Sequence, residues 1–263
     1  MRLVKASLLK LVRRPATRRT WLVMAVVLAL LYLTFGMSAG TATNPAARAS
    51  NDNMLVFPEA FRSLASMLLA FAGIAGAAYA GTVAASEWSW STVRAALARG
   101  ESRVRYVVGL FVAIALLTLV AWFALYLVGI GLILLAATVG GVRAGDPFGL
   151  TDLGVLPVLI AGGGWAVLVQ VGIGFAVSFI SRSAVAGVAT VVGLVFVEQF
   201  APMLAVPADL LRFAPVTAGM NLVRAAGDAG LDATIVLPFA VTTIYLLLAV
   251  GMASAVARRA QVA

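Results

Sequence analysis

Long apolar stretches alternate with short polar segments along the whole chain. Six stretches can each cross a bilayer as an α-helix, because a hydrocarbon core of about 30 Å needs about 20 helical residues. They cover residues 20–38, 64–85, 107–139, 158–180, 184–204 and 235–257. The pattern predicts an all-α, polytopic membrane protein with six transmembrane helices over residues 20–257 and a short tail at 258–263.

The third stretch is longer than one straight span requires, since residues 107–142 contain no charge. Two spans joined near the Gly-Ile-Gly sequence at 129–131 are an alternative. Basic residues do not discriminate, because a cytoplasmic N-terminus places 14 inside and 5 outside in either topology. No polar residue marks a turn, and unpaired backbone is unfavourable in lipid, so we expect one long, tilted or kinked helix and two cytoplasmic termini.

Residues 1–19 form a basic segment before the first span. Val4, Leu8, Leu11 and Val12 share one face of a predicted helix that ends or turns at Pro15. Such a helix lies in the membrane interface. It is either an elbow helix that touches a cytoplasmic partner or a simple orientation anchor. A cleaved signal peptide is disfavoured, because the apolar run that follows is about 19 residues long and further spans come after it.

The amino-acid composition excludes several kinds of binding site and catalysis. The chain is 63% hydrophobic and 11% charged, with a mean hydropathy of +1.06, well outside the range of soluble domains. It lacks cysteine and histidine, which excludes disulfides, Cys- or His-ligated zinc and histidine-dependent catalysis. Neither lysine, Lys5 or Lys10, follows a glycine-rich loop, so any ATP must bind another chain. We expect a non-enzymatic subunit without a cofactor or metal of its own.

The net charge of +9 comes from basic residues that flank the spans, which is typical of contact with anionic lipid rather than nucleic acid. The bias toward arginine and the abundance of Ala, Val and Gly are typical of a GC-rich bacterial genome. We therefore expect a multi-pass protein of a bacterial inner (cell) membrane. Small residues at 73, 76, 77, 162–164, 172 and 174 predict close helix contacts, within or between subunits.

Glu198, followed by Gln199, is the only ionisable residue within a predicted span. It either lines a substrate path or gate, or lies at the outer interface bonded to water or backbone. The outer segment 205–234 is predicted to hold two short helices, near 209–213 and 216–226, broken at Pro215. They re-enter the membrane or lie on its outer leaflet, and an ordinary amphipathic surface loop is the alternative.

The polar segment SEWSWSTVRAALARGESRVRY, residues 86–106, contains two tryptophans and four arginines. Its pattern predicts a short amphipathic helix between the second and third spans, with Trp90, Val93 and Leu97 on one face and a stop at Gly100. A plain cytoplasmic loop explains the arginines but not the tryptophans. Tryptophan and arginine together are enriched where proteins bind each other.

These residues resemble the cytoplasmic loop of ABC transporter permeases of the type-2 exporter class. Ser91 stands where that family usually has glycine. The basic elbow helix, six spans and helical outer segment are also similar. The resemblance implies ATPase-coupling roles for the following residues: Glu87, Trp88, Trp90, Thr92, Val93, Arg94, Leu97, Gly100 and Arg103.

The same resemblance implies that the loop helix docks in a groove of a separate ATP-binding subunit. Two such subunits, which hold ATP and Mg²⁺, would pair with two permeases, identical or paralogous, and substrate would pass between the permeases. A self-sufficient secondary carrier or channel is the alternative. Carriers, however, place polar residues near the membrane midplane and show internal repeats, and neither feature is evident here.

Overall fold

The computed structural model describes residues 2–41, 43–89, 102–147, 154–228 and 233–259, and every regular element in these ranges is a helix. Six helices are long and apolar enough to cross a membrane. They are α2 (Pro15–Thr41), α4 (Glu59–Ser89), α6 (Arg103–Gly140), α7 (Val155–Ser181), α8 (Ala184–Phe200) with its 3₁₀ extension η1 (Ala201–Leu204), and α11 (Val236–Arg259), which follows η2 (Ala233–Ile235). The chain is an all-α, polytopic membrane protein, as predicted.

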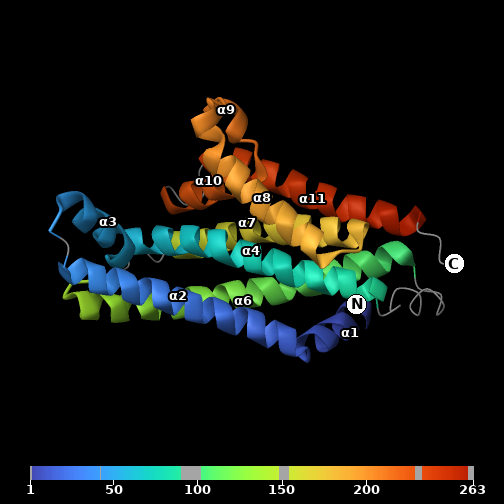
Figure 1. Cartoon of the computed structure of the whole chain (residues 1–263), viewed down its shortest axis with the longest axis horizontal. Coiled ribbons are helices and arrows are strands. Elements are labelled where there is room, and N and C mark those ends of the chain that lie inside the picture. Colours follow the sequence, from blue (N-terminus) through green and yellow to red (C-terminus); the bar gives the residue numbers. More distant parts are fainter. Residues whose placement is uncertain (1, 42, 90–101, 148–153, 229–232, 260–263) are drawn as a thin grey trace.

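Four shorter helices complete the described fold: α1 (Arg2–Val12), α3 (Pro45–Leu55), α9 (Ala208–Leu211) and α10 (Pro215–Asp228). Figure 1 shows α1 and the last turns of α11 at one end of the bundle and α3 at the other. We call the first end the terminal end. The last turns of α4 and the first turns of α6 also lie there.

The long third apolar stretch forms one continuous helix, so the two-span alternative is wrong. At 38 residues, α6 is about 57 Å long. It ends at Gly140, and the next residue, Gly141, has a φ of 67°, the left-handed conformation that glycine favours. Backbone N–H groups of Gly141 and Val142 donate to Thr138 and Ala137, which closes the helix end.

Small residues bring α4 and α7 together, and they confirm the predicted helix contacts within this chain. A Cβ atom on Gly174 would lie 2.7 Å from that of Ala77, and one on Gly73 would collide with the side chain of Gln170. The two contacts, Gly73 with Gln170 and Ala77 with Gly174, lie four residues apart on each helix. The i±4 rows of the two helices therefore interdigitate, with backbones closer than larger residues allow.

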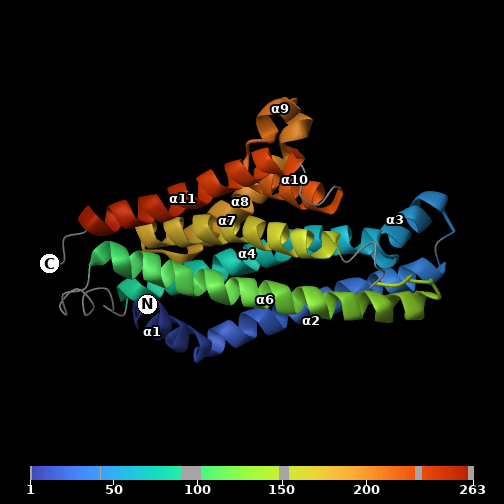
Figure 2. The ribbon, with the colours of Figure 1, turned by 180° about the vertical axis from the view of Figure 1, so that it is seen from behind.

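The outer segment forms the two predicted helices. Figures 1 and 2 show α9 projecting away from the bundle, whereas α10 lies against the bundle. Gly162 of α7 faces Leu222 and Ala226, whereas Gly219 faces Ala166. Thus α10 runs antiparallel to α7, and its first turn lies deepest in the bundle. This buried packing corrects the alternative of an ordinary surface loop.

Candidate functional site

The residue that opens the predicted coupling segment, Glu87, is fully buried. It lies in the last turn of α4, because that helix continues to Ser89 instead of ending at residue 85. A separate helix was predicted to begin at residue 86. In the described residues up to Ser89, the chain instead continues the helix of the second span. A buried carboxylate is unfavourable unless charges or hydrogen bonds compensate it.

Two other helices supply that compensation. The ammonium group of Lys10, on α1, donates to Glu87 Oε1 at 2.6 Å. The Arg14 guanidinium lies 3.9 Å from the same oxygen, just before α2 begins. The Tyr106 hydroxyl, in the first turn of α6, donates to Oε2. We call these four side chains the Glu87 cluster.

Further hydrogen bonds hold the turn between α1 and α2 against α4. Arg14 also donates to the Ser86 hydroxyl at 3.1 Å. Thr17 shares a hydrogen bond of 2.9 Å with the Tyr79 hydroxyl, and it donates to the carbonyl of Leu11 at 2.6 Å. Leu11 is itself fully buried. The predicted amphipathic helix is therefore an elbow that is bonded to the second span, not only an anchor in the interface.

This geometry defines what Glu87 can do. Its carboxylate faces α1 and α6 rather than solvent, so it is not itself a docking surface. It can instead orient the segment that follows it, because it joins the ends of three helices at one point. The resemblance implies an ATPase-coupling role for Glu87, and the buried geometry fits such a role through orientation of the segment rather than through direct contact with a partner.

Trp88 makes a second connection, toward α7. Its indole N–H donates to the backbone carbonyl of Phe179 at 3.0 Å, and the two ring centroids are 5.1 Å apart. The Arg182 guanidinium lies over the indole, 4.5 Å from its centroid. Arg182 occupies the turn between α7 and α8 with a φ of 58°. Trp88 therefore ties the end of α4 to the last turn of α7 through a hydrogen bond and to the turn that follows through a cation–π contact.

Arg103 begins α6, and its guanidinium donates to the carbonyl of Arg258 near the end of α11, at 3.0 Å. This contact joins the start of the third span to the end of the sixth. The other predicted coupling residues lie outside the described residues: Trp90, Thr92, Val93, Arg94, Leu97 and Gly100.

Glu198, the candidate within a span, is buried near the end of α8. Its carboxylate accepts from the backbone N–H groups of Val216 and Thr217, at 3.1 and 2.6 Å, and from the Thr217 hydroxyl at 2.8 Å. It therefore caps the N-terminus of α10, where a negative charge is favourable. Glu198 thus has the backbone bonds expected in one of its two interpretations, and a role in a substrate path or gate stays a prediction. Gln199, its neighbour, is exposed and does not join it.

The opposite end of α10 carries the complementary charge. Arg62, near the start of α4, donates to the carbonyl of Gly227 at 2.7 Å and pairs with Asp228 at 2.8 Å. A cation at the C-terminus of a helix is favourable for the same reason that an anion is at its N-terminus. Helix α10 is thus held at both ends by opposite charges from two different spans.

Gln170 is a buried polar residue that the sequence analysis did not single out. Its side-chain amide donates to the carbonyl of Leu69 at 3.3 Å, and it packs against the glycine at position 73. Its neighbours in sequence are apolar, so hydropathy alone hides it. One signal was available, because a lone amide inside a span usually bonds to a neighbouring helix.

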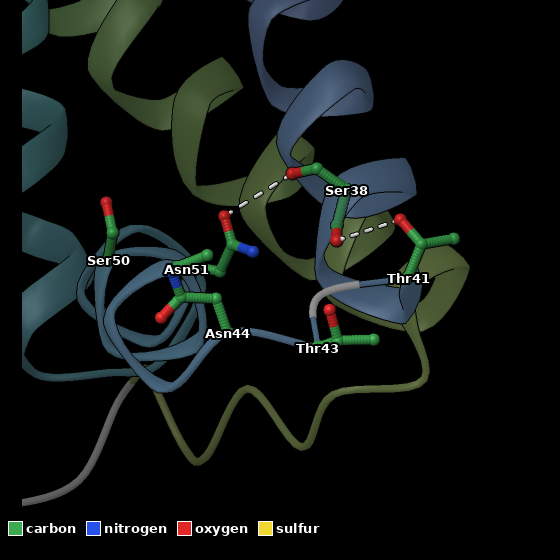
Figure 3. A pocket seen from close by; sticks show the side chains of 7 residues that line it. Ser38, Thr41, Thr43, Asn44, Ser50 and Asn51 are labelled. Carbon is green, nitrogen blue, oxygen red and sulfur yellow. Dashed lines mark hydrogen bonds between the residues drawn. The ribbon is translucent and has the colours of Figure 1, made fainter.

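A hollow of about 420 Å³ lies between the end of α2 and α3, at the far end of the bundle (Figure 3). It is lined by uncharged residues, namely Ser38, Thr41, Thr43, Asn44, Ala47, Ser50 and Asn51. Several of these side chains are already engaged. Ser38 donates to Asn51 at 3.4 Å, Thr41 donates to backbone carbonyls, and Asn44 accepts from a backbone N–H. They do not converge on a ligand.

Comparisons of the chain with protein-family models and with curated proteins find no match.

Proposed function

We propose that this chain is the permease subunit of an ATP-driven ABC exporter, which couples ATP hydrolysis on a separate subunit to export of substrate across a bacterial inner membrane. The observation that carries the proposal is the position of Glu87 and Trp88. They open the segment that resembles the type-2 coupling loop, and their side chains bond to α1, α6 and α7.

Those hydrogen bonds provide a path along which a displacement at the end of α4 reaches α1, α6 and α7. A partner that displaces residues 90–101 would pull on the end of α4. Lys10 and Tyr106 would pass that displacement to α1 and α6, and Trp88 would pass it to α7. Energetic coupling between distant sites is carried by packed and hydrogen-bonded groups, and the contacts of Glu87 and Trp88 at the terminal end are groups of this kind.

The assembly that follows has two permeases, identical or paralogous, and two ATP-binding subunits that carry ATP and Mg²⁺. Charge supports a cytoplasmic position for the terminal end. The contacts described above place five basic residues at this end of the bundle: Lys10, Arg14, Arg103, Arg182 and Arg258. Such an excess of basic residues is typical of the cytoplasmic side.

The test is recovery of an ATP-binding protein with the tagged, full-length chain from membranes of its source cell. We expect wild-type chain to retain a nucleotide-binding ATPase, identified by mass spectrometry. Trp90→Asp and Arg94→Glu should each lower its recovery at least about ten-fold, the loss expected when a central aromatic or arginine contact is removed. Arg259→Glu is the matched control, because Arg259 is exposed at the terminal end and lies outside residues 86–106.

Each variant is first checked for a monodisperse gel-filtration profile, so that misfolding is not mistaken for lost binding. ATPase recovery that survives both substitutions would refute the coupling role of this segment. Wild-type chain that recovers no ATP-binding protein, even after crosslinking, would favour a self-sufficient carrier or channel instead.

A further inference from the structure

A second hollow, of about 320 Å³, lies at the turn between α1 and α2. It is lined by Arg13, Pro15, Arg18 and Arg19. Both views of the molecule place this turn at the margin of the bundle, on the side opposite α9 (Figures 1 and 2). Three of its four lining residues therefore carry a positive charge, on a face that the described helices leave open.

Among the described residues, these arginines differ from Lys10 and Arg14 in having no partner within the protein. Lys10 and Arg14 point inward to Glu87, whereas Arg13, Arg18 and Arg19 are exposed. Within the described part of the chain, none of the three guanidinium groups forms an ion pair or a side-chain hydrogen bond. Three exposed like charges close together raise the local positive potential and attract anions.

The surface beside the hollow indicates which kind of anion. Leu22, Val23, Val26 and Leu30 follow Arg19 at spacings of three, four, seven and eleven residues, so they share its face of α2. All four are exposed, from 49% at Val26 to 64% at Leu22. Leu9 and Val12, on α1, are exposed on the other side of the turn. A charged hollow that continues into an apolar strip matches a molecule with an anionic head and hydrocarbon tails.

We infer that the hollow binds the phosphate headgroup of an anionic phospholipid, with the acyl chains lying along Leu22, Val26 and Leu30 of α2. Guanidinium groups bind phosphate oxygens through paired, charge-assisted hydrogen bonds. The site would anchor the turn that also carries Lys10 and Arg14, and it does not depend on the proposed transport function.

The experiment counts lipids on the purified, full-length protein by native mass spectrometry in a mild detergent. The probe is phosphatidylglycerol, with phosphatidylcholine of the same chains as the neutral comparison and inorganic phosphate as competitor. The variant is R13Q/R18Q/R19Q. The matched control is R105Q/R258Q/R259Q, which removes the same charge from exposed residues at the same end of the bundle but leaves the hollow unchanged.

We expect wild-type protein to bind one phosphatidylglycerol in preference to phosphatidylcholine. The hollow variant should lose affinity for phosphatidylglycerol on the order of 100-fold or more, since each charge-assisted hydrogen bond from a guanidinium group to the phosphate contributes about ten-fold. The control should change less than about five-fold, because charges outside the hollow act on the headgroup only through screened, long-range attraction. Equal losses in the two triple variants, or no loss in either, would overturn the site. Displacement of the lipid by equimolar inorganic phosphate would overturn its assignment to a lipid.

Discussion

Replacing Glu87 tests whether its cluster holds the elbow helix α1 to the bundle. Removing one partner of a buried ion pair costs about 3–5 kcal/mol, because the remaining charge is left uncompensated. Two features reduce this figure for Glu87→Ala. Lys10 is 34% exposed and can regain water, and Arg14 keeps its bond to Ser86. We therefore expect a loss of about 3 kcal/mol for Glu87→Ala and about 1–2 kcal/mol for Glu87→Gln, whose amide oxygen still accepts a hydrogen bond.

Two measurements check this expectation on the purified protein. For a chain of this size, about 1 kcal/mol corresponds to a shift in Tm of about 2–4 °C, so Glu87→Ala should melt roughly 6–12 °C lower. Hydrogen exchange of the backbone amides of α1 and the first turn of α6 should quicken, because these segments lose their common anchor. Exchange in α10, which lies away from the cluster, should not change.

Glu59→Gln is the control on the same helix. Glu59 is 52% exposed and 3.6 Å from Arg62, and surface pairs of this kind contribute less than about 1 kcal/mol. A double-mutant cycle with Lys10→Met adds a stricter test, since contacting residues should show non-additive losses of about 0.5–3 kcal/mol. The reasoning fails if Glu87→Ala leaves the exchange of α1 unchanged, or if Glu59→Gln lowers the Tm as much.

Three further outcomes follow from the packing. Glu198→Ala leaves buried backbone donors of α10 unpaired, so it should lower the free energy of unfolding by about 1–3 kcal/mol. Hydrogen exchange in the first turn of α10 should also quicken, and unchanged exchange would contradict the capping role of Glu198. Gly36→Ala should lower the Tm, since its Cβ would collide with a carbonyl oxygen of α6, whereas Gly131→Ala, with open space around it, should not. Trp88→Phe keeps an aromatic ring but loses the hydrogen bond to α7, so thermal melting should show a loss of about 1 kcal/mol.

Much of the fold was predictable from hydropathy, because a lipid environment leaves the chain few options. A charge-free run can cross a bilayer only as a helix whose backbone groups are paired internally. That rule favoured one helix over residues 107–139, where the structure has α6. Pro215 likewise marked the start of α10, since proline is favoured in the first turn of a helix.

One packing signal was present in the sequence but was not used. Gly36 and Gly40 are four residues apart on α2, and they face Ala136 and Gly140, which are four apart on α6. This is the small-xxx-small spacing that lets helices in membranes approach closely. The small residues that predicted helix contacts lie in the second and fourth spans, so the contact between the first and third spans was not predicted.

The role of Glu87 could not have been predicted in the same way. It lies 77 residues from Lys10 and 19 from Tyr106, and only the folded arrangement of α1, α4 and α6 brings them together. In the sequence it adjoins a polar, arginine-rich segment, so periodicity assigns it to an exposed face. A charged side chain is buried only where partners compensate its charge. Partners on other helices leave no periodic pattern in the sequence around that residue.

Helix α4 connects the two sites that the structure defines. Arg62, near its start, holds the C-terminal end of α10, and Glu87, near its end, holds α1 and α6. The helix has 31 residues, about 47 Å, and it packs along α7 through interlocking small residues that leave little room to slide. A displacement of the segment after Ser89 would therefore move α4 and α7 together, and Arg62 would carry that movement to α10. Under the proposed function, α10 is the outer element best placed to respond when an ATPase acts on the opposite end of the bundle.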